Sequence, residues 1–141
     1  MLWEFHFIKK AIEGMCTESE RSFFLLALLR ILPRFSKLIA TGGWLSVRRG
    51  GARVTSLAQA FRNQVSLMME DVKERESHNV PGARVEMADA RSLPLSDESI
   101  DAVITSPPYV NRHDYTRVFG VELMFAFLDY EETKRLRYQS F

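Results

Sequence analysis

The sequence predicts an α/β protein: a mainly helical region over residues 1–82, followed by a segment over residues 83–141 that contains two short strands. Three stretches of the first region place apolar residues at the spacing of a buried helix face. In the second region, two short apolar or alternating runs each end abruptly in polar turn residues, as strands do. The chain has 141 residues, 46% hydrophobic and 26% charged, which is ordinary for one globular domain.

The first helix is expected over residues 2–12, where apolar side chains cover a broad face. Gly14 follows at the position where a helix commonly ends. His6 lies among apolar neighbours, so we expect it to be a packed core residue and not a ligand.

The second helix is expected to begin at Thr17, because Thr17 and Glu20 have the spacing of a capping box. Residues 23–29 are apolar nearly all round, which predicts a buried helix. Pro33 should then kink or end it, since proline lacks the N–H that a helix interior uses.

The third helix is expected after Thr55 or Ser56, either of which is a good N-cap residue. Its apolar stripe follows the helical spacing and consists of residues 57, 61, 65, 68 and 72. Met68 and Met69 are predicted to fill the core.

The positive charge gathers in the first half of the chain. Residues 1–60 hold nine Lys or Arg against four Glu, although the whole chain has a net charge of only +1. Residues 41–53 form a glycine- and arginine-rich loop that matches no phosphate-binding motif, so a mobile basic connection is expected there. Phosphate contact and a solvated surface both remain open for these cations.

Two strands are expected in the second region. Residues 84–88 alternate between polar and apolar side chains and are followed by Asp89. Residues 102–104 form an apolar run, expected to be a buried strand, that stops at Ser106, Pro107, Pro108 and Tyr109. Ligands of open α/β sheets bind at the carboxyl ends of strands. Asp89 and residues 106–109 would both lie at such ends.

The Ser-Pro-Pro-Tyr stretch presents hydrogen-bond acceptors and almost no donors. Neither Pro107 nor Pro108 has an N–H, and each ring fixes its φ angle, so the turn is rigid. This suits a planar substrate with an exocyclic amine, whose N–H groups would donate to the Ser106 side chain and the Pro107 carbonyl. Such bonds favour a pyramidal nitrogen with a lone pair free to attack a methyl donor, while Tyr109 stacks on a base swung out of the duplex.

Residues 106–109 resemble the catalytic tetrapeptide of S-adenosylmethionine-dependent amino-methyltransferases. The serine form is most similar to that of the cytosine-N4 DNA enzymes. The resemblance implies a partial Rossmann-like methyltransferase fold, S-adenosylmethionine as cofactor and DNA as partner. Two alternatives stay open: an RNA guanine-N2 or other amine methyltransferase, and an inactive remnant that serves as a binding or dimerisation module.

The resemblance also implies roles for residues on either side of this motif. Asp89 would contact the cofactor adenine and Ala90 would offer its backbone N–H, although a turn or N-cap role is the simpler interpretation of Asp89 alone. On the substrate side the implied residues are Asn111, Arg112, Asp114 and Tyr115. Arg112 would reach a phosphate, and Asp114 would take up the amine's proton or cap the next helix, which is expected from Thr116 to Phe127.

Two parts of the family pattern are not found. The glycine-rich turn that holds the methionine part of the cofactor and the acidic residue that holds its ribose have no counterpart, and nothing before Val54 indicates a strand followed by such a turn. We therefore expect a fragment or split subunit that needs a complementary methyltransferase segment, or that self-associates through open sheet edges. The single Cys16, the lack of a signal peptide and the lack of a long apolar span predict a soluble, cytoplasmic protein with no membrane contact, and no metal site is expected.

Overall fold

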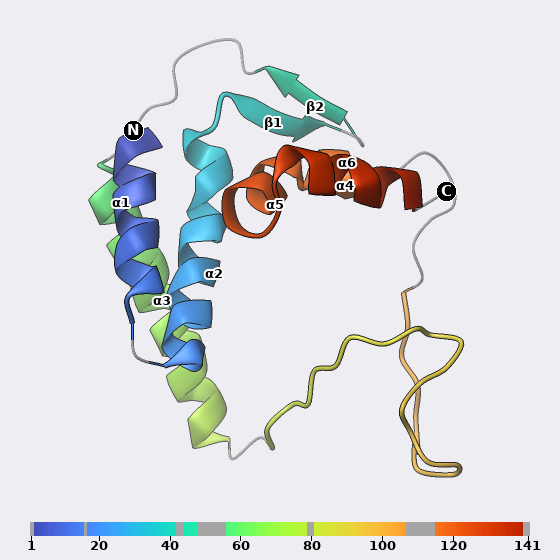
Figure 1. Ribbon diagram of the computed structural model, residues 1–141. Helices are drawn as coiled ribbons and strands as arrows, with labels where there is room; N and C mark the ends of the chain where they lie inside the picture. The colour runs from blue at the N-terminus through green and yellow to red at the C-terminus, as the bar shows by residue number, and fades with distance from the viewer. Residues whose placement is uncertain are drawn as a thin grey trace.

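A computed structural model describes residues 2–15, 17–41, 44–47, 56–78, 81–106 and 115–139 of the chain. This part contains six helices and one hairpin of two strands (Figure 1). In order along the chain they are α1 (Leu2–Glu13), α2 (Glu18–Phe35), β1 (Leu38–Thr41), β2 (Trp44–Val47), α3 (Leu57–Ser77), α4 (Tyr115–Val118), α5 (Gly120–Ala126) and α6 (Tyr130–Gln139).

The local signals that predict the first two helices are confirmed. The N–H of Gly14 still donates to the carbonyl of Lys10, 3.2 Å away, and α1 ends at the preceding residue. Thr17 and Glu20 form a complete capping box: Glu20 N–H donates to Thr17 Oγ1 (3.2 Å) and Thr17 N–H donates to Glu20 Oε2 (3.3 Å). The box satisfies backbone donors that the first turn of α2 would otherwise leave unpaired.

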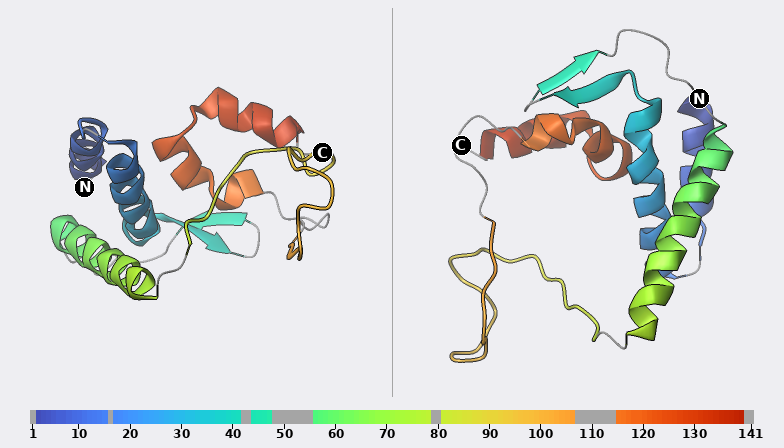
Figure 2. Two further views of the ribbon diagram at one scale, coloured as in Figure 1. Left: turned by 90° about the horizontal axis from the view of Figure 1, so that it is seen from below. Right: turned by 180° about the vertical axis from the view of Figure 1, so that it is seen from behind.

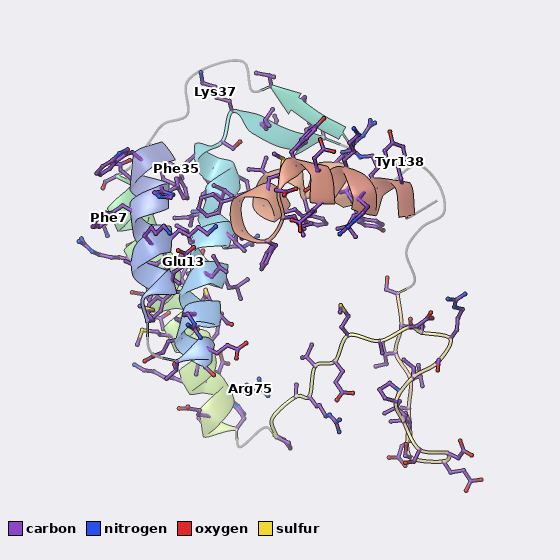
Figure 3. The ribbon with its side chains drawn as sticks, in the orientation of Figure 1. Phe7, Glu13, Phe35, Lys37, Arg75 and Tyr138 are labelled. Carbon is purple, nitrogen blue, oxygen red and sulfur yellow. The ribbon has the colours of Figure 1, made fainter. Side chains whose placement is uncertain are left out.

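Helix α2 is the centre of the helical body, because α1, α3 and α5 all pack against it. The buried apolar core combines residues from both ends of the chain with this helix. Its buried members are Phe5, Ile12, Leu28, Ile31, Leu32 and Leu57, with Val121 and Phe125 among those packed against them. The ring of Phe5 contacts the ring of Phe35 edge-on, with 5.7 Å between centroids, and that of Phe125 in the same way (5.8 Å). Phe35 is labelled in Figure 3.

A polar contact reinforces the joint between α1 and α5. Lys9 Nζ donates to the carbonyl of Phe125 at 2.7 Å and also lies 5.3 Å from the centroid of its ring. One side chain therefore satisfies a carbonyl near the end of α5 and makes a cation–π contact there. The first and last parts of the sequence thus form one packed body.

The hairpin was not predicted, and its second strand lies within residues 41–53, which were expected to form a loop. Its antiparallel register runs from the Leu38–Val47 pair to the Thr41–Trp44 pair, and the hydroxyls of Thr41 and Ser46 lie 2.9 Å apart. The expected loop over residues 41–53 is therefore shorter than predicted, since β2 occupies 44–47; residues 42–43 and 48–55 lie outside the described residues.

Helix α2 differs from its prediction in two ways. It is not buried all round: Ala27, Leu28, Ile31 and Leu32 face the core, whereas 59% of Leu26 is exposed. Pro33 neither ends nor interrupts the helix, which continues to Phe35 before Ser36 caps it. A proline so close to the end disturbs few backbone hydrogen bonds, because only the last turn follows it.

Three further expectations about single residues are wrong. His6 is exposed, because consecutive helix residues point about 100° apart and it is the preceding residue, Phe5, that faces the core. Met69 is also exposed, and its neighbour Met68 is only half-buried and is not among the residues that pack against the core. Thr116 does not cap a helix, because it lies inside α4, and the helix predicted from there to Phe127 is divided at Phe119 into α4 and α5.

Residues 81–106 form no strand, which contradicts both predicted strands and leaves the described residues without a parallel sheet. The apolar side chains expected in a buried sheet, those of Val85, Met87, Val103 and Ile104, are 80% or more exposed. Figures 1 and 2 show this segment leaving the helical body as a coil. Strand pairing requires a neighbouring backbone to satisfy its N–H and C=O groups, and no described segment provides one here.

No helix in the described ranges combines the length and the apolar character needed to cross a membrane.

Candidate active site

The best-defined part of the predicted site is a tight turn at Asp89. The N–H of Ser92 donates to the carbonyl of Asp89 at 2.9 Å, and the N–H of Arg91 donates to the Asp89 side-chain oxygen Oδ1, also at 2.9 Å. Aspartate is favoured in turns because its side chain can accept a hydrogen bond from the backbone N–H two residues later, as Asp89 does here from Arg91. The simpler interpretation of Asp89, as a turn residue, therefore describes its local role.

The Arg91 side chain returns to the same carboxylate. Its Nη2 donates to Oδ2 at 2.6 Å, and its Nε lies 3.0 Å from Oδ1 and 3.2 Å from Oδ2. The guanidinium therefore meets both carboxylate oxygens, the forked pairing that arginine makes well. Sequence reasoning did not predict this pair, although an acid and an arginine two residues apart in a turn could have indicated it.

This pairing sets the protonation of Asp89. The hydrogen bonds from the Arg91 side chain, and secondly that from its backbone, hold the pKa of the Asp89 carboxyl below its ordinary value of 3.8. The same contact raises the pKa of the Arg91 guanidinium. Asp89 is thus a carboxylate at neutral pH, the form that accepts hydrogen bonds from an amine.

The turn places a hydrogen-bond acceptor next to a backbone donor. The Asp89 carboxylate is an acceptor for an exocyclic amine, and none of the hydrogen bonds found among the described residues uses the neighbouring Ala90 N–H. The Asp89 and Arg91 side chains are 50% and 89% exposed, so both are accessible from solvent. Because Arg91 contacts both oxygens of Asp89, an incoming amine would have to share the carboxylate with it or displace it.

The structure describes only the first residue of the predicted catalytic motif. Ser106 is exposed at the end of the coil, and Pro107, Pro108 and Tyr109 lie outside the described residues. Of the predicted substrate residues, Asn111, Arg112 and Asp114 also lie outside them. Tyr115 is the first residue of α4 and is 43% exposed.

The helical body holds both ends of the segment that contains these residues. The coil follows α3 in the sequence, and the chain re-enters the body at α4, which packs against β2, α5 and α6. The Nε of Arg137 in α6 donates to Oγ1 of Thr116 in α4 at 3.3 Å. The element directly after the motif is therefore fixed by contacts with the rest of the body (Figure 1).

Within the ranges that the structure describes, no three His, Cys, Asp or Glu side chains come together in an arrangement that could hold a metal ion.

Comparison with known proteins finds Type II methyltransferases. The chain is 36% identical over 87 residues to the Type II methyltransferase M.BsoBI of Geobacillus stearothermophilus, covering 58% of this chain and 17% of that protein. It is 27% identical over 131 residues to the Type II methyltransferase M.AvaI, both of Nostoc sp. (strain PCC 7120) and of Anabaena variabilis, covering 79% of this chain and 27% of each relative. No protein-family model matches the chain. No solved structure matches it either.

The chain thus spans between 17% and 27% of the length of these curated relatives. Over that part of their length the chain is similar in sequence to these two Type II methyltransferases.

Proposed function

We propose that this chain is the base-handling part of an S-adenosylmethionine-dependent DNA amino-methyltransferase, most specifically a cytosine-N4 enzyme, and acts as a fragment or split subunit. The observation that carries the proposal is the Ser106–Tyr109 motif in a chain related to two Type II methyltransferases. The M.AvaI alignment covers 79% of this 141-residue chain, which is a stretch of about 111 residues. A continuous stretch of that length starts at residue 31 at the latest and ends at residue 111 at the earliest, so it includes residues 31–111. That relationship therefore extends over both Asp89 and the motif.

The motif residues would bind and orient the target amine. Ser106 and the Pro107 carbonyl accept its two N–H groups, and Tyr109 stacks on the base that has left the duplex. The nitrogen lone pair, no longer delocalised into the ring, is then directed at the methyl group. As the new N–C bond forms, the methyl–sulfur bond of the donor would break and leave a neutral thioether, and the amine's extra proton would pass to a nearby base, for which Asp114 is the candidate.

The turn at Asp89 would hold the cofactor. The anionic carboxylate and the adjacent Ala90 N–H supply an acceptor and a donor side by side, which matches the hydrogen-bonding edge of adenine. S-adenosylmethionine, when bound, supplies the electrophilic methyl group. The chain has no glycine-rich turn for the methionine part, so a second segment must provide the rest of this site.

The exposed coil supports the need for a complementary segment. Val85, Met87, Val103 and Ile104 expose large apolar surfaces that soluble proteins usually bury. Strands from the missing part of a methyltransferase would pair with residues 84–88 and 102–105 and cover those side chains. The two predicted strands, and with them the Rossmann-like sheet, would then form on association.

A calorimetric titration with S-adenosylmethionine tests this proposal. The isolated chain should bind weakly or undetectably, and binding should appear after addition of an M.BsoBI fragment from which the aligned segment has been removed. Micromolar binding by the isolated chain would contradict the need for a partner.

Methyl transfer from labelled S-adenosylmethionine tests the motif in the reconstituted complex. Tyr109→Ala or Pro107→Ala should abolish transfer to duplex DNA and leave cofactor affinity nearly unchanged. Tyr130→Ala, at an exposed tyrosine of α6, is the matched control and should retain activity. Unchanged turnover in the Tyr109 and Pro107 variants would remove the motif from the mechanism, and transfer to RNA in preference to DNA would favour the RNA alternative.

A second candidate function, a binding or dimerisation module, is favoured by a different observation. The helical body has its own core and does not depend on the coil to bury it. A methylase remnant of this kind would fold and associate without catalysis. Sedimentation of the purified chain, followed by the methyl-transfer assay on the reconstituted complex, distinguishes the two: stable self-association with no transfer supports the module.

A further inference from the structure

Helix α6 carries a basic surface that neither the motif nor the cofactor turn uses. Glu131, Lys134, Arg135 and Tyr138 line a shallow pocket on this helix. Their spacing of three, four and seven residues places them on one face. We call Lys134, Arg135 and Tyr138 the α6 basic face; Figure 3 shows Tyr138 on the part of α6 far from α1.

The charges of α6 are separated along its length. Glu131 and Glu132 lie in the first turn. The Oε2 of Glu132 accepts a hydrogen bond from the N–H of Asp129 at 2.9 Å, so this carboxylate already has a partner there. The cations follow, at Lys134, Arg135 and Arg137. The face is therefore positive where Arg135 and Tyr138 project from it.

The cations of the α6 basic face are accessible. Lys134 Nζ lies 3.9 Å from Glu131 Oε2, a long contact between exposed side chains that contributes little. Arg135 is exposed and forms no ion pair with a described residue. Tyr138 is 73% exposed beside them, so a phenol hydroxyl lies within the same patch.

The α6 basic face is attached to the element that follows the catalytic motif. Arg137, on the same helix, donates to Thr116, and α4 packs against α6. Thr116 is ten residues after Ser106 in the sequence. A ligand bound to the α6 basic face would therefore lie at a fixed position relative to α4, the helix that follows the motif in the sequence.

We propose that the α6 basic face binds backbone phosphates of duplex DNA beside the target base, a role that rests on the proposed function. Arginine, lysine and tyrosine are among the residues that contact phosphate oxygens, and such contacts set the position of a protein on DNA without reading its sequence. Charge complementarity favours this partner, because the face offers two cations and a hydroxyl donor and only one carboxylate, that of Glu131.

Cations in the second half of a helix also stabilise it through the helix dipole. The two roles differ in a measurable way. Phosphate contact makes affinity for DNA depend on salt, with the logarithm of the association constant falling by about 0.9 per phosphate neutralised for each unit of log salt concentration. A role confined to helix stability leaves that slope unchanged.

The test uses the whole chain and a fluorescein-labelled duplex of about 20 base pairs, with anisotropy measured between about 50 and 200 mM salt. The Lys134→Gln/Arg135→Gln double variant should reduce the salt slope by about 1.8, the value for two phosphates. Tyr138→Ala should weaken binding at every salt concentration, and Tyr138→Phe will separate the hydroxyl from the ring. The matched control is Arg62→Gln/Lys73→Gln, two exposed cations of α3, which should keep the wild-type slope. Circular dichroism checks that each variant retains its helices.

Three results would overturn the inference: no duplex binding by the wild-type chain at the lowest salt concentration, an unchanged slope in the α6 variant, or an equal loss in the α3 control. The outcome is separable from that of the proposed function. A slope change confined to the α6 variant supports the phosphate site even if the reconstituted complex transfers no methyl group, in which case the catalytic proposal alone fails.

Discussion

At the scale of single residues, the charge of Asp89 depends on Arg91. The folded pKa of the carboxyl is below 3.8, chiefly because the Arg91 side chain hydrogen-bonds to its charged form. For an acid whose pKa is lowered, the contact stabilises the turn above the ordinary pKa, and this stabilisation is lost as pH falls through the lower, folded value. The turn at residues 89–92 should therefore persist throughout the neutral range and loosen only in strong acid.

Replacing Arg91 by Ala should raise the pKa of Asp89 towards 3.8, because its main hydrogen-bond donor is removed. The pKa is measured by an NMR titration of the side-chain carboxyl carbon. Arg84→Ala is the control, since Arg84 pairs with Glu86 and not with Asp89. An Asp89 titration that is the same in the Arg91 variant and the wild type would show that the ion pair is not formed in solution.

The residues of the candidate site were predictable to different degrees. A polar turn after residue 88 follows from Asp89 and its neighbours, and the structure has one there. The Arg91 pairing was missed, because a side chain that folds back on its own turn leaves no periodic pattern. The acceptor character of Pro107 and Pro108 follows from proline chemistry alone.

At the scale of elements, the helices were predictable and the sheet was not. The three longest helices, α1, α2 and α3, are largely specified locally: apolar spacing indicates α1 and α3, and the capping box indicates α2. The β1–β2 hairpin had a sequence signal that was overlooked, since Gly42 and Gly43 separate two apolar runs by two residues. The strands expected at 84–88 and 102–105 have suitable patterns, but a strand also needs a partner, which the pattern of one segment does not supply.

The orientation of α2 is a further feature that local pattern did not provide. An almost wholly apolar stretch does not indicate which side of the helix faces the core. The helices that pack against α2, which are α1, α3 and α5, determine it: Leu28 is buried and Leu26 is exposed. These two leucines are thus a matched pair on one helix that differ in burial.

Leu28→Ala should destabilise the fold by about 2–5 kcal/mol, because it leaves a cavity in the core next to Ile31. Leu26→Ala should change the free energy of unfolding by about 0.5 kcal/mol or less, since its side chain is mostly in solvent. Both values come from urea unfolding followed by far-UV circular dichroism. Equal losses in the two variants would mean that another molecule covers Leu26 in solution.

At the scale of the whole molecule, the chain consists of a helical body and a coil that leaves it and returns. The body is formed by residues on both sides of residues 81–106, since Phe5 and Lys9 of α1 contact Phe125 of α5. The coil adds no residue to the core. The apolar residues of the coil are therefore left uncovered by the described part of the body, to which the chain returns at α4.

Cutting the coil should therefore leave the body intact. A site-specific protease sequence placed at the exposed turn of Asp97 and Glu98 divides the chain without touching a core residue. After cleavage, the two pieces should elute together in size-exclusion chromatography and keep the helical circular dichroism of the uncut chain, because the contacts of Phe125 with α1 and the packing of α5 on α2 join them.

Phe125→Ala provides the control for that experiment. Truncating this ring removes its contacts with Phe5 and Lys9. The pieces of the cleaved variant should therefore separate at a lower urea concentration than the pieces of the cleaved parent chain. Pieces of the parent chain that separate immediately after cleavage, without denaturant, would mean that the coil itself holds the two parts of the body together. If the pieces of the parent chain elute together and Phe125→Ala makes them separate more easily, the shared core holds the two parts together. The apolar residues of the coil are then not needed for the stability of the body and could contact a partner.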